Sequence, residues 1–122
     1  MMAIMFGRTT RREQPGLCEA YRQRFMAVGV PSILTVSRAI SARDDLVPRL
    51  GEINCPTLVV VGEEDAALPV ALSRRLAAGI RGAELVVVPR AGHLSALEAP
   101  EAVTRAIEGI LDRLEPTGQA AA

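Results

Sequence analysis

Two stretches of the chain decide the fold: CPTLVVVGEEDAALP at residues 55–69 and AELVVVPRAGHLSALEAPEAV at residues 83–103. Each contains a run rich in valine, at residues 57–61 and 84–88, and the runs end at Gly62 and Pro89. Short apolar runs without polar alternation are typical of strands that are buried on both faces, as in a parallel sheet. We therefore expect two parallel β-strands at residues 57–61 and 84–88.

Helical patterns follow both expected strands. After Pro69, apolar residues recur at helical spacing as far as Gly82, and a second helix is expected to begin at Pro100. The apolar positions of the two helices are Leu72, Leu76 and Ile80, then Val103, Ile107, Ile110, Leu111 and Leu114. The order β-α-β-α predicts an α/β fold with a parallel sheet. Two such strands need further strands beside them, so the sheet is expected to be incomplete.

Residues 1–50 are expected to be helical and to contain no strand. Leu17, Tyr21 and Phe25 form one apolar stripe, with a helix end near Gly29, and a second helix is expected from Ser32 to Ile40. Residues 1–14 show no clear period. We accordingly divide the chain into a helical segment, 1–50, and a strand-helix segment, 51–122.

Composition narrows the classes of function. The chain has two Phe, one Tyr and no Trp, so it lacks the aromatic residues that stack on nucleic-acid bases. Residues 1–50 hold eight Arg against four acids and residues 51–122 hold six against ten, which gives +4 and −4. The basic part could favour anions or an acidic partner surface, but solvated helix faces explain it more simply.

Neither the cysteines nor the hydropathy indicates a secreted or membrane protein. Cys18 and Cys55 form no metal motif and no disulfide framework, and Cys55 is expected to be buried. No apolar run approaches the ~20 residues of a membrane span. A soluble cytoplasmic protein is expected, without a nucleic-acid or membrane partner.

Asp65 and His93 are the candidate catalytic residues. Each lies just after one of the two expected strands, and parallel strands present their carboxyl ends at one edge of the sheet, where ligands gather. A carboxylate that accepts the Nδ1–H of an imidazole fixes the tautomer that acyl transfer needs. Taken singly, Asp65 could cap the following helix and His93 could be an ordinary loop histidine. Glu63 and Glu64 are expected to be solvated, with Glu64 a second candidate for the acid.

The two stretches closely resemble the C-terminal part of the α/β-hydrolase superfamily. Gly62, Asp65 and Pro69 match the family's G-x-x-D-x-x-x-P acid loop. The histidine motif A-G-H-x-x-x-x-E-x-P-E is matched by Ala91, Gly92, His93, Glu98, Pro100 and Glu101. Residues 1–50 resemble, less specifically, the helical cap. The resemblance implies a Ser/His/Asp triad that cleaves ester, lactone or related acyl bonds and needs no cofactor and no metal.

The nucleophile of that triad is missing from these residues. The family's G-x-S-x-G elbow precedes the acid and the histidine, and no serine here lies between glycines at that spacing. Cys18 lies in a superficially similar segment, but the Arg-rich residues before it cannot form the buried strand that an elbow needs. Ser95 follows His93 too closely to act as its nucleophile.

We therefore interpret the chain as a C-terminal fragment that is inactive alone and would take an ester-like substrate only when completed. An upstream G-x-S-x-G segment is expected in the gene if the fragment is a truncation. The alternative is a non-catalytic interaction module that self-associates or pairs with a complementing chain through its sheet edge. A remnant without function is a third interpretation. Relatives with this fold also perform acyl transfer, dehalogenation or C–C cleavage, so the reaction of the parent stays open.

Overall fold

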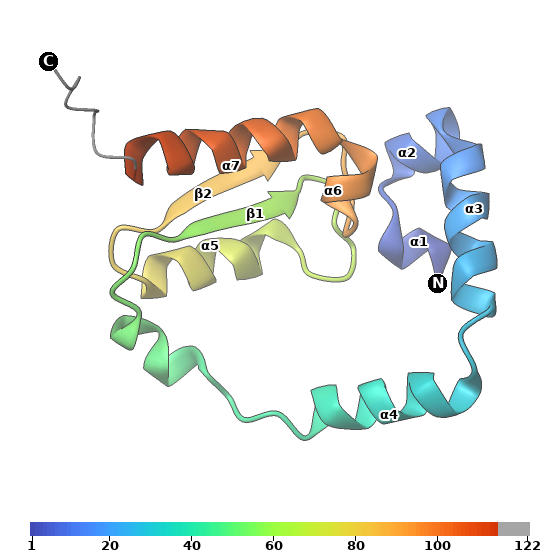
Figure 1. Cartoon of the computed structure of the whole chain (residues 1–122), viewed down its shortest axis with the longest axis horizontal. Helices are drawn as coiled ribbons and strands as arrows, with labels where there is room; N and C mark the ends of the chain where they lie inside the picture. Colours follow the sequence, from blue (N-terminus) through green and yellow to red (C-terminus); the bar gives the residue numbers. More distant parts are fainter. Residues whose placement is uncertain (115–122) are drawn as a thin grey trace, which may run out of the picture.

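The computed structural model describes residues 1–114. Its elements, in chain order, are α1 (Met2–Met5), α2 (Arg8–Glu13), α3 (Pro15–Met26), α4 (Val30–Ser41), the 3-10 helix η1 (Val47–Glu52), β1 (Leu58–Gly62), α5 (Val70–Gly79), β2 (Glu84–Val88), α6 (Ser95–Glu98) and α7 (Pro100–Leu114). Figure 1 shows the two strands between α5 and α7, with α1, α2 and α3 beyond the ends of the strands. The predicted β-α-β-α order is confirmed.

The two strands pair in parallel, with Leu58 opposite Glu84 and Gly62 opposite Val88. β1 is offset by one residue from its predicted range, and β2 agrees with its range. Val59, Val61 and Val88 are buried, but residues 85–87 of β2 are only half-buried. Burial on both faces is therefore less complete than the valine runs predict. Within residues 1–114 the sheet has two strands, which agrees with the expected incomplete sheet.

Helices α5 and α7 cover the two faces of the sheet (Figure 1). Both begin after a proline or at one, where the missing N–H breaks no helical hydrogen bond. Their apolar stripes are only partly covered, since Leu72, Leu76, Ile107, Leu111 and Leu114 remain exposed. The helices thus present more apolar surface than the two described strands can bury.

The N-terminal residues form structure that the sequence analysis missed. Residues 1–14 contain α1 and α2, and Phe6 between them is among the most completely buried side chains of the described chain. The ring of Phe6 packs edge-to-face on Tyr21 of α3, with the ring centroids 5.3 Å apart. Helices of four and six residues are too short to show a hydrophobic period, so only these distant contacts reveal them.

Two further expectations need correction. Helix α3 ends at Met26 rather than near Gly29, since the last turn closes with the Ala27 N–H donating to the Gln23 carbonyl and the Val28 N–H donating to the Phe25 carbonyl, each at 3.1 Å. Cys55 is exposed rather than buried, because β1 begins only at Leu58 and Cys55 lies in the loop before it. Position before a buried strand does not by itself imply burial.

Helix α4 lies away from the strands in Figure 1, and none of its residues is buried. Val30, Leu34, Val36 and Ile40 are exposed, although the helix is amphipathic. None of the helices within residues 1–114 combines the length and apolar character needed to cross a bilayer. The division at Gly51 stays a prediction. The low-complexity sequence of residues 119–122 predicts a frayed tail, and these positions lie outside the described residues.

A glycine is required at the end of β1. A Cβ at Gly62 would overlap the carbonyl oxygens of Ala91 and Gly92, which are backbone atoms and cannot rotate away. We predict that Gly62→Ala lowers the free energy of unfolding by about 2–3 kcal/mol through overpacking. Urea unfolding followed by circular dichroism measures it. Gly51→Ala is the control, since nothing lies within 4 Å of its added Cβ, and an equal loss there would refute the steric explanation.

Candidate active site

Asp65 is held in one orientation by its own loop. It is the third residue after β1, and its Oδ1 accepts hydrogen bonds from the backbone N–H groups of Ala67 and Leu68 at 2.9 and 2.8 Å. The side chain is 6% exposed. These bonds occupy one carboxylate oxygen and leave Oδ2 to face a partner.

The partner of Asp65 is His93, on the loop after β2. Asp65 Oδ2 lies 3.0 Å from His93 Nδ1. An ionised carboxylate only accepts hydrogen bonds, so the shared proton belongs to Nδ1 and the lone pair of the neutral ring to Nε2. The imidazole is 31% exposed. The structure thus brings together the two residues that the sequence analysis singled out, 28 positions apart.

Backbone contacts fix the two loops against each other. The N–H of Glu63 donates to the carbonyl of Val88 at 2.9 Å, and that of Glu64 donates to the carbonyl of Ala91 at 2.8 Å. These bonds extend the pairing of the strands into the loops, and Gly62 allows the close approach of the Ala91–Gly92 backbone. The acid and the histidine therefore belong to one backbone-bonded unit.

Arg90 has an unusual backbone in this unit. Its φ of 62° is the only positive value at a non-glycine residue of the described chain. The carboxylate of Glu63 accepts its N–H at 3.0 Å, and its guanidinium pairs with Glu13 of α2. Such a conformation costs of order 1 kcal/mol or more and persists where neighbours determine it. It turns the chain sharply, three residues before His93.

Glu64 is not the solvated acid that the sequence analysis expected. Its side chain is 10% exposed and accepts hydrogen bonds from the Thr9 N–H and hydroxyl at 2.8 and 2.7 Å and from Arg8 Nε at 3.2 Å. Burial raises the pKa of this carboxyl, but the bonds from Thr9 and Arg8 outweigh burial and leave the pKa below its usual value. Glu64 anchors the N-terminal segment beside the site and does not contact His93, so the second candidate for the acid loses support.

Glu98 is a buried carboxylate that the sequence analysis used only as a motif match. It is 7% exposed, and it accepts hydrogen bonds from the N–H groups of Gly7 at 2.8 Å and Leu94 at 3.1 Å. Residue 7 is remote in sequence, so no local pattern could reveal this contact. The one signal in the sequence that marks Glu98 is its place in the histidine motif, five residues after His93.

Cys18 and Ser95, the two residues weighed as nucleophiles in the sequence, gain no support from the described residues. Cys18 lies inside α3, and burial together with the negative charge of Glu98 raises the pKa of its thiol. A reactive cysteine needs the opposite shift. Ser95 begins α6. Within residues 1–114, no three His, Cys, Asp or Glu side chains are arranged to hold a metal ion.

A polar hollow of about 480 Å³ lies beside the acid. Arg8 and Arg11 of α2 line one side, and the acid loop from Glu63 to Ala66 lines the other. The site is thus open to solvent on the side of Asp65, next to the N-terminal segment.

Comparison with known proteins places the chain in a family. A model of the Ndr family matches residues 1–113. Over 68 residues the chain is 40% identical to a 2-hydroxy-6-oxononadienedioate/2-hydroxy-6-oxononatrienedioate hydrolase of Paraburkholderia xenovorans (strain LB400), which covers 56% of this chain and 24% of that protein.

Solved structures extend the likeness to nearly the whole chain. A thermophilic esterase from Thermogutta terrifontis superposes with a TM-score of 0.90 at 32% identity, over 95% of this chain and 43% of the esterase. Est816, described as an N-acyl homoserine lactone degrading enzyme, gives a TM-score of 0.74 at 33% identity, over 88% of this chain and 44% of that one. The chain spans less than half of the proteins it resembles. It belongs to the Ndr family of the α/β-hydrolase superfamily and forms part of that fold.

Proposed function

We propose that this chain contributes the acid and the histidine of a Ser/His/Asp hydrolase site whose nucleophile lies outside these residues. One observation carries the proposal: the 3.0 Å contact between Asp65 Oδ2 and His93 Nδ1 at the carboxyl edge of a parallel sheet. The orientation of the carboxylate by Ala67 and Leu68 supports it, because that bonding is already complete without substrate. Without a nucleophile the chain alone is inactive.

The proposed roles of His93 and Asp65 follow from the tautomer in which Nδ1 of His93 carries the proton. His93 Nε2 takes the proton of an attacking serine hydroxyl and later returns it to the leaving group. Asp65 holds the ring and stabilises the imidazolium that forms between these steps. The partial exposure of His93 leaves the ring accessible to a serine that approaches from another part of the fold.

The proposed substrates are esters, lactones or related acyl compounds. The esterase and the lactone-degrading enzyme, the two structures compared above, favour this class. The similarity to a 2-hydroxy-6-oxononadienedioate/2-hydroxy-6-oxononatrienedioate hydrolase makes hydrolysis of that class of compound the competing reaction. Substrate choice among these depends on a pocket of which the described residues form only a part.

A chimera tests the catalytic roles directly. We predict that residues 1–114, grafted in place of the matching part of the Thermogutta terrifontis esterase, support hydrolysis of p-nitrophenyl acetate. Asp65→Asn in the chimera lowers kcat by about 10⁴-fold, because the imidazole then takes the wrong tautomer. His93→Ala lowers kcat by about 10⁶-fold and leaves only the residual rate that the oxyanion hole and substrate binding of the esterase provide.

Asp112→Asn is the matched control, since Asp112 is an exposed aspartate on α7, and it leaves kcat unchanged. A folded, active chimera that is insensitive to Asp65→Asn would refute the assigned acid. An active chimera that tolerates His93→Ala would refute the assigned base.

The isolated chain provides a second prediction. We expect no hydrolysis of p-nitrophenyl acetate above background, because no nucleophile stands beside His93 within residues 1–114. Spectrophotometric release of p-nitrophenol measures it. A rate that His93→Ala abolishes but serine reagents do not affect would show a different mechanism.

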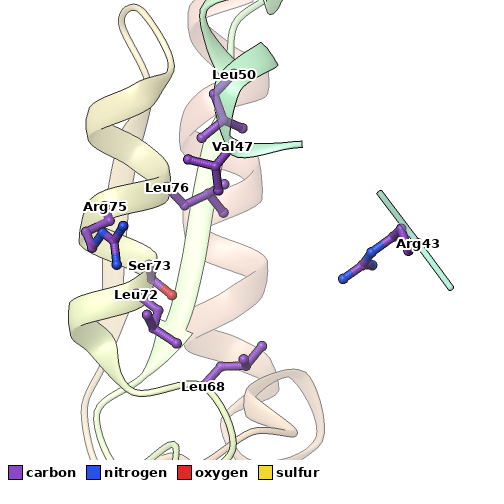
Figure 2. A pocket seen from close by; sticks show the side chains of 8 residues that line it. All are labelled: Arg43, Val47, Leu50, Leu68, Leu72, Ser73, Arg75 and Leu76. Atoms are coloured by element: carbon purple, nitrogen blue, oxygen red, sulfur yellow. The ribbon is translucent and has the colours of Figure 1, made fainter. Parts of the chain in front are cut away.

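A groove on the surface favours a second candidate function, an interaction module. It measures about 410 Å³ and lies between α5, η1 and the acid loop. Figure 2 shows Val47, Leu50 and Leu76 gathered at one end of the groove and Leu68 at the other. In the described sheet β1 pairs with β2 alone, so its other edge is open to a parallel strand. The proposed partner is a chain that carries the nucleophile strand.

Association is measurable in the purified chain. If the open edge and the groove drive self-association, size-exclusion chromatography with light scattering gives a dimer or larger species that Leu72→Glu and Leu76→Glu return to monomer. The reason is that a charge in an apolar contact is costly. Arg74→Glu, an exposed residue of the same helix, is the control. A well-folded monomer at all concentrations would argue against self-association through this edge.

A further inference from the structure

The backbone on the C-terminal side of His93 is held by residues far away in the sequence. The N–H of Leu94, which follows the histidine, points to two acceptors, the carbonyl of Met5 and Glu98 Oε1, each at 3.1 Å. The other oxygen of Glu98 accepts the N–H of Gly7 at 2.8 Å. One carboxylate thus bonds the histidine loop and the link between α1 and α2 at the same time.

The two backbones that Glu98 joins are in direct contact. A Cβ at Gly92, just before His93, would overlap the backbone of Phe6 and Gly7. His93 is therefore flanked on both sides by residues that touch the Met5–Gly7 segment, Gly92 through packing and Leu94 through hydrogen bonds. Displacement of this segment would change the support of the histidine on both sides.

A carboxylate here needs a physical reason, because burying a charge is costly unless it is hydrogen-bonded. Within residues 1–114 Glu98 forms no salt bridge, and its hydrogen bonds are those from the two N–H groups. Bonds from N–H groups to an ionised acceptor are about twice as strong as neutral ones and more directional. These bonds offset the free-energy cost of burying the carboxylate. They also fix the two loops in one geometry.

We propose that Glu98 is the positioning residue of His93: it bonds the Met5–Gly7 segment to the histidine loop and thereby keeps Nδ1 aligned with Asp65. Glu98 acts through the backbone of Leu94 and does not touch the reacting atoms. The N-terminal segment thus forms part of the support of the acid–base pair. This inference rests on the proposed function, since alignment matters only if His93 works as a base.

The chain contains one histidine, which makes the test direct. In ¹H–¹⁵N NMR spectra of the full chain, every imidazole signal belongs to His93. The wild type is expected to show an Nδ1–H proton protected from solvent by Asp65, together with an Nε2 shift typical of an unprotonated nitrogen. Asp65→Asn removes that protection.

Glu98→Gln is the decisive variant because it keeps the shape of the side chain but turns an NH₂ group toward one of the two N–H donors. We expect roughly tenfold faster solvent exchange of the His93 Nδ1–H, as for loss of one hydrogen bond to a charged group. The amides of Gly7 and Leu94 exchange faster as well. Backbone spectra and circular dichroism verify that the variant is folded.

Two control variants distinguish a specific effect of Glu98 on the position of His93 from a general loosening of the N-terminal segment. Glu101→Gln changes a nearby acid that is 90% exposed, and it leaves the His93 signal unchanged. Glu64→Gln weakens the other anchor of the N-terminal segment, at Thr9, but leaves the bonds to Leu94 intact, so it affects the His93 proton less than Glu98→Gln does.

The outcomes are distinguishable. A folded Glu98→Gln variant with unchanged exchange of the His93 Nδ1–H would overturn the role of Glu98, as would an equal effect of Glu64→Gln. If Glu98→Gln does not fold, Glu98→Asp, which keeps both acceptor oxygens on a shorter stem, replaces it under the same criterion. A wild-type spectrum without a protected Nδ1–H would instead refute the proposed function itself, whatever Glu98 does.

Discussion

The parallel pairing of β1 and β2 is the constraint on which the rest of the site depends. Its register sets Gly62 opposite Val88, so both loops leave the same edge of the sheet. Asp65 and His93 follow at distances that allow their 3.0 Å contact. A shift of one residue would move one loop by ~3.3 Å along the strand, more than a hydrogen bond tolerates. The pairs from Glu63 to Val88 and from Glu64 to Ala91 continue the ladder past the strands and prevent that shift.

The sequence could predict the parts of the structure that depend on local pattern. The valine runs located both strands to within a residue, and Asp65 and His93 could be paired because parallel strands end at a common edge. The sequence could not locate α1 and α2, because their few residues carry no period and the buried Phe6 between them packs on Tyr21 of α3 and against the backbone of Gly92. The burial predicted for Cys55 was wrong for a related reason, because a loop before a strand is buried only where another element covers it.

Glu64 and Glu98 show why local sequence patterns do not predict the contacts around the site. In the sequence each is a charged residue in a loop motif, for which solvation is the usual expectation. In the structure both are bonded to the N-terminal segment, Glu64 to Thr9 and Glu98 to Gly7. One Arg of the positive part, Arg8, pairs with Glu64 of the negative part, although its own side chain is 84% exposed. The charge asymmetry is therefore partly paired within the chain, beside the solvated faces expected for it.

The small size of the described sheet explains why so much apolar surface is exposed around the site. A two-stranded sheet is marginal on its own in water, and here α4, α5 and α7 all present apolar residues that the described strands do not cover. The contact between Asp65 and His93 does not depend on that surface, because it joins the two loops directly and Asp65 is held by the backbone of its own loop. The local geometry of Asp65 and His93 is thus complete within these residues, whereas burial of the helix faces requires additional strands, as in the larger proteins that the chain resembles.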